Sequence, residues 1–169
     1  MMKTFADQIK DFSAKVKTQC NDTVSILLFK IYEEVDKRSP VGDQELWIYN
    51  KGTKENPEYV HWLAYNDKDG YVGGHFRANW QLGVGTLPTT EVAGVDPQGA
   101  ATQGRILAAI PDEAAGKVYY LANTAPYALR LENGWSTQAP AGMVGLAVSM
   151  FPELIDVSVK IAKAKADSK

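Results

Sequence analysis

The chain has 169 residues, enough for one domain with a sizeable buried core. Its 18 basic and 20 acidic side chains nearly balance, whereas a dedicated nucleic-acid binder normally carries a basic excess. The only cysteine, Cys20, excludes an internal disulfide and a cysteine-rich metal site, and favours synthesis in a reducing cytosol. No apolar run approaches the roughly 20 residues of a membrane span, and the charges within MMKTFADQIKDF argue against a signal peptide.

Residues 4–37 predict a long helix. Its apolar residues recur three or four positions apart and form one stripe: Phe5, Ile9, Phe12, Val16, Cys20, Val24, Leu27, Ile31 and Val35. Thr4 suits the N-cap, with Asp7 in the first turn, and Pro40 ends the helix because the residue before a proline is pushed towards extended backbone. Residues 21–23 are poor helix formers where the helix could kink or split, and the second half is expected to be the buried part.

Residues 42–73 are rich in turns and aromatic side chains. Residues 46–49 and 59–65 have the β-branched and aromatic content of strands. The polar, glycine- and proline-containing segment 50–58 between them predicts a turn, so this region is expected to hold a hairpin.

The next part of the chain alternates short elements with a long loop. Residues 75–80 predict a turn or short helical piece, and residues 81–87 predict a strand. Residues 88–99 have a loop's composition, and a loop of this length without its own structure is often an interaction element. A short helix is expected at 102–110, ended by Pro111.

The last part predicts a strand and two helices. Residues 117–122 have strand composition. Pro126 suits the first turn of a short helix that Gly134 would end. Pro140 opens a last helix with a broad apolar surface, and Pro152 should kink that helix unless a break falls there.

Side chains suited to metal binding or nucleophilic catalysis are scarce. The chain has two histidines, His61 and His75, whereas a zinc site needs three or four ligands. His61 lies in an alternating strand pattern and is interpreted as a packed or surface residue. Ser136 lacks the glycine two residues later that a nucleophile elbow requires.

Two further motif matches fail. Gly83-Val84-Gly85 begins like a dinucleotide fingerprint, but Pro88 stands where the third glycine should be. The segment around Gly70 resembles a calcium loop, but its twelfth position is Phe76 and not glutamate.

Glu132 is the carboxylate that stands out. It lies in a short predicted helix whose other face is apolar, and a buried carboxylate would need a partner such as Arg130 or Arg77. A structural role is favoured over a role in an active site.

Three signals occur in a fixed order along the chain. They read Ser39-Pro40-Val41, then Gly74-His75-Phe76-Arg77-Ala78-Asn79-Trp80, then Asn123 to Met143 with Ala139-Pro140-Ala141-Gly142-Met143 at its end. The series resembles the tail-completion (neck, or minor tail) protein family of long-tailed bacteriophages, lambdoid type. The family-motif residues, expected to be structural, are Pro40, Gly74, Arg77, Trp80, Asn123, Tyr127, Glu132, Gly134, Trp135, Pro140 and Gly142. In the commonest pattern the first two signals are nearly adjacent, whereas here residues 42–71 separate them.

The resemblance implies an α+β fold, with a long N-terminal helix, a small twisted and mostly antiparallel sheet, and a short helix and a C-terminal helix packed on one face. It implies one tail-completion-like domain over 1–169, with an inserted hairpin region at about 42–73 and a long loop at about 88–99. Tyr127, Glu132 and Trp135 are expected to be structural and to fix the turn between the short helix and the last helix, through a packed aromatic residue and a satisfied carboxylate.

The implied function is that of a structural virion protein. Such proteins form a ring, commonly six-fold, between capsid connector or adaptor proteins and the tail tube or terminator. DNA crosses the ring without specific binding, and no catalytic residue, cofactor, metal or membrane is implied. The protein would be made in the bacterial host cytoplasm and reside in the neck of the virion. The alternatives are a tail-terminator or tail-tube subunit and, more distantly, a small soluble hydrolase.

Two expectations concern surfaces of this ring. The 42–73 insertion and the 88–99 loop are expected to make the subunit contacts. The channel is expected to be lined by acidic or neutral side chains, because fixed cations would hold phosphates. The acidic loop residues best placed for this are Asp43, Glu45, Asp67, Asp69, Glu91 and Asp96.

Overall fold

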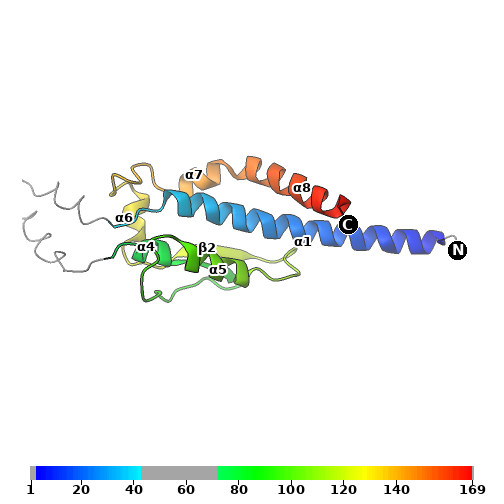
Figure 1. Ribbon diagram of the computed structural model, residues 1–169, viewed down its shortest axis with the longest axis horizontal. Helices are drawn as coiled ribbons and strands as arrows, with labels where there is room; N and C mark the ends of the chain where they lie inside the picture. The colour runs from blue at the N-terminus through cyan, green and yellow to red at the C-terminus, as the bar shows by residue number, and fades with distance from the viewer. Residues whose placement is uncertain (1–2, 43–71, 169) are drawn as a thin grey trace, which may run out of the picture.

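A computed structural model of the chain describes residues 3–42 and 72–168 (Figure 1). The hairpin predicted from residues 46–49 and 59–65 lies outside the described residues, as does His61. The predicted contact role of the insertion falls mainly on the same residues. The fold class is confirmed: a long N-terminal helix, a small antiparallel sheet and a C-terminal helix form an α+β structure.

Helix α1 spans Phe5–Arg38, close to the predicted 4–37. Thr4 is the N-cap of a capping box, because its hydroxyl accepts the Asp7 N–H while the Asp7 carboxylate accepts the Thr4 N–H. The helix ends at Ser39, whose extended backbone is the conformation that the following proline requires.

The predicted weak place in α1 at residues 21–23 does not split the helix. Each poor helix former has a partner: the Asn21 side chain accepts the Ala115 N–H at 2.8 Å, and Asp22 pairs with a lysine of the last helix. The Thr23 hydroxyl donates to the Gln19 carbonyl at 2.7 Å. Tertiary contacts therefore outweigh the low helix propensity of this segment.

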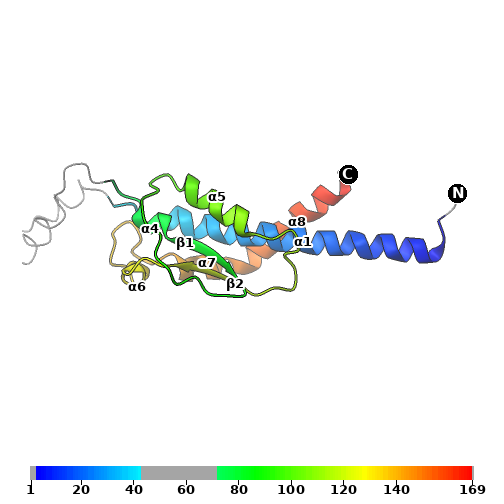
Figure 2. The ribbon, with the colours of Figure 1, turned by 90° about the horizontal axis from the view of Figure 1, so that it is seen from below.

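The sheet has two antiparallel strands, β1 (Trp80–Val84) and β2 (Tyr119–Asn123). Trp80 pairs with Asn123 at one end and Val84 with Tyr119 at the other. The predicted strand at 81–87 ends early because Gly85 adopts a left-handed conformation, with φ of 72°. A single turn, α4 (His75–Ala78), precedes β1, and α5 (Ala100–Ala109) lies beside the strands (Figure 2).

The C-terminal part forms three helices: α6 (Ala128–Glu132), α7 (Val144–Ser149) and α8 (Phe151–Asp167). The helix predicted from Pro140 begins only at Val144, and a break at Met150 places Pro152 in the first turn of α8, where its missing N–H costs nothing. Helix α8 runs back along α1 (Figure 1), fastened near its end by an ion pair from Lys165 to Asp22 at 2.6 Å.

The core joins the second half of α1 to the elements below and above it in Figure 1. The prediction that this half of the helix is the buried part is therefore confirmed. Its members come from α1, α4, β1, α5, α7 and the segments around α6: Tyr32, Val35, Phe76, Trp80, Ile106, Ala125, Ala139, Met143 and Ala147. The first half of α1 contributes no residue to this core, and its N-terminal turns project beyond the other described elements (Figures 1 and 2).

A buried hydroxyl ties the end of α1 to the sheet. Ser39 is 5% exposed; its hydroxyl accepts the Trp80 indole N–H at 2.7 Å and donates to the Val35 carbonyl at 2.8 Å. Trp80 is 2% exposed, so its indole N–H has no access to water.

We expect Ser39→Ala to lower the free energy of unfolding by about 1–3 kcal/mol, the cost of a buried donor without an acceptor. Chemical denaturation measures this change. Ser149→Ala is the matched control, because the Ser149 hydroxyl also bonds to a helix carbonyl but lies on the surface. Equal effects of the two substitutions would contradict the role assigned to the Ser39–Trp80 bond.

Candidate functional site

The three sequence signals meet at one end of the molecule, where α1 ends and α4, α6 and α7 lie (Figure 1). We call residues 39–41, 74–80 and 123–143 the motif junction. Gln138 bonds to both backbone groups of Val41, at 3.0 and 2.8 Å. The Asn123 amide donates to the Phe76 carbonyl at 2.8 Å. The signals are therefore joined directly to one another by hydrogen bonds.

Glu132 holds the start of α7. One carboxylate oxygen accepts the N–H groups of Met143 and Val144, and the other accepts that of Gly145, all at 2.9 Å. These amides begin a helix and have no partner within it. The predicted partners Arg77 and Arg130 are wrong: a carboxylate can be satisfied by backbone amides, and here it closes the loop between α6 and α7.

The hydrogen bonds at Glu132 also set its charge state. Burial alone would raise the pKa of this carboxyl, but the three backbone N–H groups outweigh burial, so the pKa lies below its ordinary value of 4.5. Glu132 is therefore ionised at neutral pH, and its negative charge faces the positive end of the α7 dipole.

Gly142 makes room for this carboxylate. Its φ is 73°, and a Cβ placed there would lie 2.4 Å from the Glu132 carbonyl oxygen. Gly134, at φ of 80°, ends α6 in a Schellman motif: its N–H bonds to the Leu131 carbonyl, and the Trp135 N–H bonds to the Arg130 carbonyl. Gly134 and Gly142 are thus both required by backbone geometry.

The aromatic residues of the junction differ in exposure. Trp80 and Phe76 are buried and pack edge to face at 5.9 Å. Tyr127 is partly exposed, and its hydroxyl lies 2.9 Å from the His75 ring. Trp135 is 71% exposed, so the expectation of a packed aromatic residue there is wrong. The Schellman motif turns the chain outward at this point, and only the Arg130 guanidinium lies over the ring among the described contacts.

Arg77 fastens the other side of the junction. Its guanidinium donates to the Pro97 carbonyl at 2.7 Å and the Asp36 carbonyl at 3.2 Å, and Nε lies 3.2 Å from the Asp36 carboxylate. Burial raises the pKa of Asp36 despite the neighbouring Arg77 charge. Arg77 thus joins the end of α1 to the 88–99 loop, which is its structural role.

Gly74 and Pro40 complete the motif positions. Gly74 has φ of 102°, and a Cβ there would lie 2.4 Å from the Pro97 nitrogen, so the loop approaches its backbone closely. Pro40 is buried and follows the α1 C-cap. Pro140 is exposed, but its carbonyl closes over Gly134. Every motif position thus serves a turn or an internal contact, and Trp135 does so through its backbone N–H while its ring stays exposed.

Two acidic residues expected in the channel can be located. Asp96 is 8% exposed and accepts the Thr102 N–H at 2.7 Å, which caps the first turn of α5. Burial would raise the pKa of Asp96, but hydrogen bonds from Thr102 and from the Gly99 backbone outweigh burial and lower it. A channel-lining role for Asp96 is therefore wrong. Glu91 remains exposed beside His75, at 3.2 Å, and the other four acidic residues lie outside the described part of the chain.

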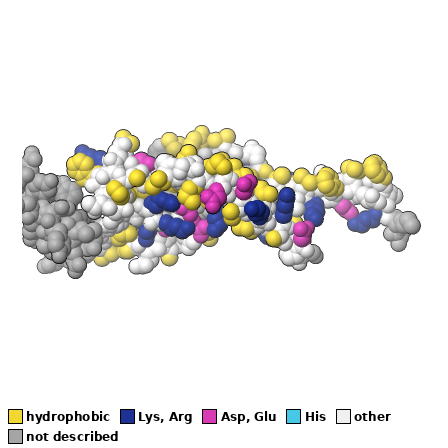
Figure 3. Space-filling view, turned by 90° about the horizontal axis from the view of Figure 1, so that it is seen from above, with side chains coloured by type: hydrophobic (Ala, Val, Ile, Leu, Met, Phe, Trp, Pro, Cys, Tyr) yellow, Lys and Arg dark blue, Asp and Glu magenta, His cyan; other side chains and the backbone are white. Residues whose placement is uncertain are grey.

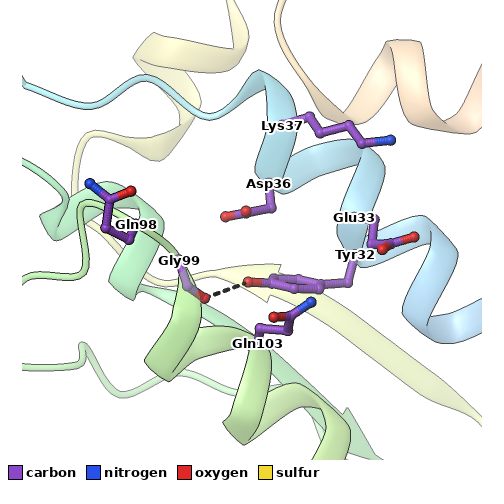
Figure 4. A pocket seen from close by; sticks show the side chains of 7 residues that line it. All are labelled: Tyr32, Glu33, Asp36, Lys37, Gln98, Gly99 and Gln103. Carbon is purple, nitrogen blue, oxygen red and sulfur yellow. Dashed lines mark hydrogen bonds between the residues drawn. The ribbon is translucent and has the colours of Figure 1, made fainter.

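A cavity of about 200 Å³ lies between α1 and the start of α5 (Figure 4). Its lining is Tyr32, Glu33, Asp36, Lys37, Gln98, Gly99 and Gln103. The Tyr32 hydroxyl donates to the Gly99 carbonyl at 3.4 Å, and burial, followed by the charges of Asp36 and Asp96, raises the Tyr32 pKa. A protonated tyrosine is a hydrogen-bond donor, and the carboxylate of Asp36 lies close enough to help raise its pKa.

Within 3–42 and 72–168, no three His, Cys, Asp or Glu side chains gather as metal ligands. In the same ranges, no helix combines the length and the apolar character needed to cross a bilayer. Comparison with known proteins finds no matching family model, curated protein or solved structure.

We expect Glu132→Ala to lower the free energy of unfolding at pH 7 by about 1–3 kcal/mol, since three backbone donors lose their acceptor. The difference in unfolding free energy between the wild type and the variant should be largest above pH 4.5, the ordinary glutamate pKa. It should shrink as the pH falls through the lowered pKa of Glu132, because the hydrogen bonds stabilise the fold only while the carboxyl is ionised. Denaturation across pH measures this. Glu113→Ala, which removes an exposed glutamate, should change little, and a pH-independent loss at Glu132 would contradict the charge assigned to it.

Gly142→Ala should destabilise the protein more than Gly85→Ala. The two glycines have nearly the same φ, 73° and 72°, but only Gly142 has atoms within 4 Å of the added Cβ. The left-handed conformation costs an alanine about 1–2 kcal/mol at either site, so the excess at Gly142 measures the contact with Glu132. Thermal denaturation of both variants measures the difference, and equal melting temperatures would show that the close approach carries no energy.

Proposed function

We propose that this chain is a structural protein of the phage head-to-tail junction. It acts as a subunit of a ring that completes or terminates the tail and joins it to the capsid connector around the DNA channel. Its partners are copies of itself, the connector or adaptor proteins on one side, and the tail tube or terminator proteins on the other. It is made in the host cytoplasm and resides in the neck of the virion.

The observation that carries the proposal is the ordered series of motif residues from Pro40 to Gly142. These residues occupy turns and buried contacts of a single junction, as Glu132 and Arg77 show. A motif that maintains shape supports a function in assembly, because binding surfaces must be held in fixed positions by a rigid scaffold.

The exposed apolar surface supports association as well. Exposed large side chains are concentrated on the first half of α1 and on the segment from α6 to the start of α8. Contiguous exposed apolar patches generally mark interaction sites in soluble proteins. The near-neutral net charge of −2 suits a channel through which DNA passes without being held.

The alternatives differ in how the residues support them. A tail-terminator or tail-tube subunit would use the same scaffold and would differ in its neighbours within the particle. A small hydrolase has less support, because Tyr32 and Asp36, which line the described cavity between α1 and α5, have internal partners: Tyr32 bonds to the Gly99 carbonyl and Asp36 lies beside Arg77.

Disruption of the gene in the phage that carries it tests the proposal. We expect filled heads and separate tails that fail to join, with infectivity restored by the wild-type protein supplied in trans. Quantitative mass spectrometry of purified virions should find several copies per particle, about six for a six-fold ring. Virions that assemble normally without the protein, or that never contain it, would contradict the proposal. Salt-sensitive DNA binding by the purified protein would count against the passive channel.

A further inference from the structure

The first half of α1 carries an apolar stripe that is exposed among the described residues. Phe5, Ile9, Phe12 and Val16 are 78%, 52%, 66% and 38% exposed. They are spaced four, three and four residues apart, which is the spacing of a seam that packs against another helix. We call these four residues the α1 stripe.

The α1 stripe is built as a surface rather than as a frayed end. The capping box at Thr4 and Asp7 fixes the first turn of the helix. By helical periodicity the nearest flanking residues are uncharged, whereas Asp7, Lys10 and Asp11 fall on the opposite side. The α1 stripe thus presents an apolar face with an uncharged border.

A second stripe with the same spacing runs along α7 and the start of α8. Val144, Val148 and Phe151 are 42%, 64% and 41% exposed, and the partly buried Ile155 continues the series. We call these four residues the α7 stripe. Hydrophobic side chains gather over α7 and over the projecting end of α1, with charged side chains over the region between them (Figure 3).

One molecule cannot join its own two stripes. Helix α1 has 34 residues and is therefore about 51 Å long. Helix α7 lies beside the C-terminal end of α1, and the α1 stripe occupies the other end (Figure 1). Within one molecule the two stripes therefore do not cover each other.

We propose that the α1 stripe of one copy packs on the α7 stripe of a second copy, and that this contact repeats head to tail. The closure of the repeated contact into a ring rests on the proposed function. A heterologous contact closes into a ring when its rotation permits, and it covers both exposed stripes with one kind of interface.

Charge favours this pairing over a pair of α1 stripes. Residues 3–17 contain four lysines and two aspartates, a net charge of +2, whereas residues 144–159 contain Glu153 and Asp156 and no basic residue, a net charge of −2. Lys15 and Lys17 pair with Asp167 and Glu113 of the same molecule, so the opposite net charges of the two segments orient the association and supply little of its energy.

The size of the contact suits a ring. Phe5 and Phe12 alone could bury on the order of 300 Å². With the rest of the α1 stripe and the facing α7 stripe, the contact approaches the roughly 1,000 Å² at which specific interfaces begin. A contact of this size is weak singly and becomes stable when closure makes each one intramolecular.

Complementary variants of the full chain test the proposal by sedimentation velocity at concentrations up to about 1 mM. Phe12→Glu removes the α1 stripe and Val148→Glu removes the α7 stripe. Both side chains are more than 60% exposed, so circular dichroism and melting temperature should be unchanged. Each variant alone should self-associate at least about tenfold more weakly than the wild type. An equimolar mixture should form a dimer and nothing larger, because it contains one intact copy of each stripe.

Leu107→Glu is the matched control, since Leu107 is 49% exposed on α5 and belongs to neither stripe. A wild-type chain that stays monomeric at about 1 mM, a control variant that is equally impaired, or a mixture that forms no dimer would each overturn the proposal. Val148→Glu that associates like the wild type would show that the α1 stripes pair with each other and would overturn it too.

The proposed function and the proposed contact between stripes can be overturned by different results. Absence of the protein from virions would overturn the neck assignment while leaving the mixing result intact. A normal ring formed in virions by the double variant Phe12→Glu/Val148→Glu would overturn the contact while leaving the neck assignment intact.

Discussion

Three backbone amides at the start of α7 converge on the carboxylate of Glu132, and the path of the C-terminal third of the chain depends on this contact. The first amides of a helix have no partner of their own, so the carboxylate both satisfies them and places α7 against α6. Helix α8 follows directly and packs along α1. The geometry leaves space for glycine alone at position 142, which explains why the carboxylate and this glycine belong to one motif.

The rigid junction contrasts with the surfaces beyond it. The side chains of Arg77, Asn123 and Glu132 form hydrogen bonds with backbone groups of the same molecule. The apolar side chains left exposed are on helices that the junction holds in place, notably α7, and on the projecting half of α1. This division of roles is characteristic of a scaffold that presents binding surfaces.

The sequence predicted elements best where local chemistry determines them. Thr4 and Pro40 bounded α1 to within a residue, because caps and prolines act on adjacent backbone. Prediction from the sequence was less accurate for contacts between distant segments. The acceptor role of Asp96 at α5 and the amide partners of Glu132 depend on how loops approach helix ends, which residue spacing does not encode. Trp135 looked like a packed aromatic residue, but the turn at Gly134 directs it outward. The second half of α1 was expected to be the buried part, as found, but periodicity identifies an apolar face and does not tell what covers the α1 stripe.

Amide hydrogen exchange at the start of α7 tests the central claim most directly. First-turn amides of a helix exchange quickly unless a group outside the helix accepts them, so protection there reports on Glu132 itself. The account predicts that the amides of Met143, Val144 and Gly145 are protected in the wild-type protein. It predicts that Glu132→Ala removes this protection while the amides in the buried half of α1 remain protected. Rapid exchange of the three amides in the wild type, or protection that survives the substitution, would contradict the account.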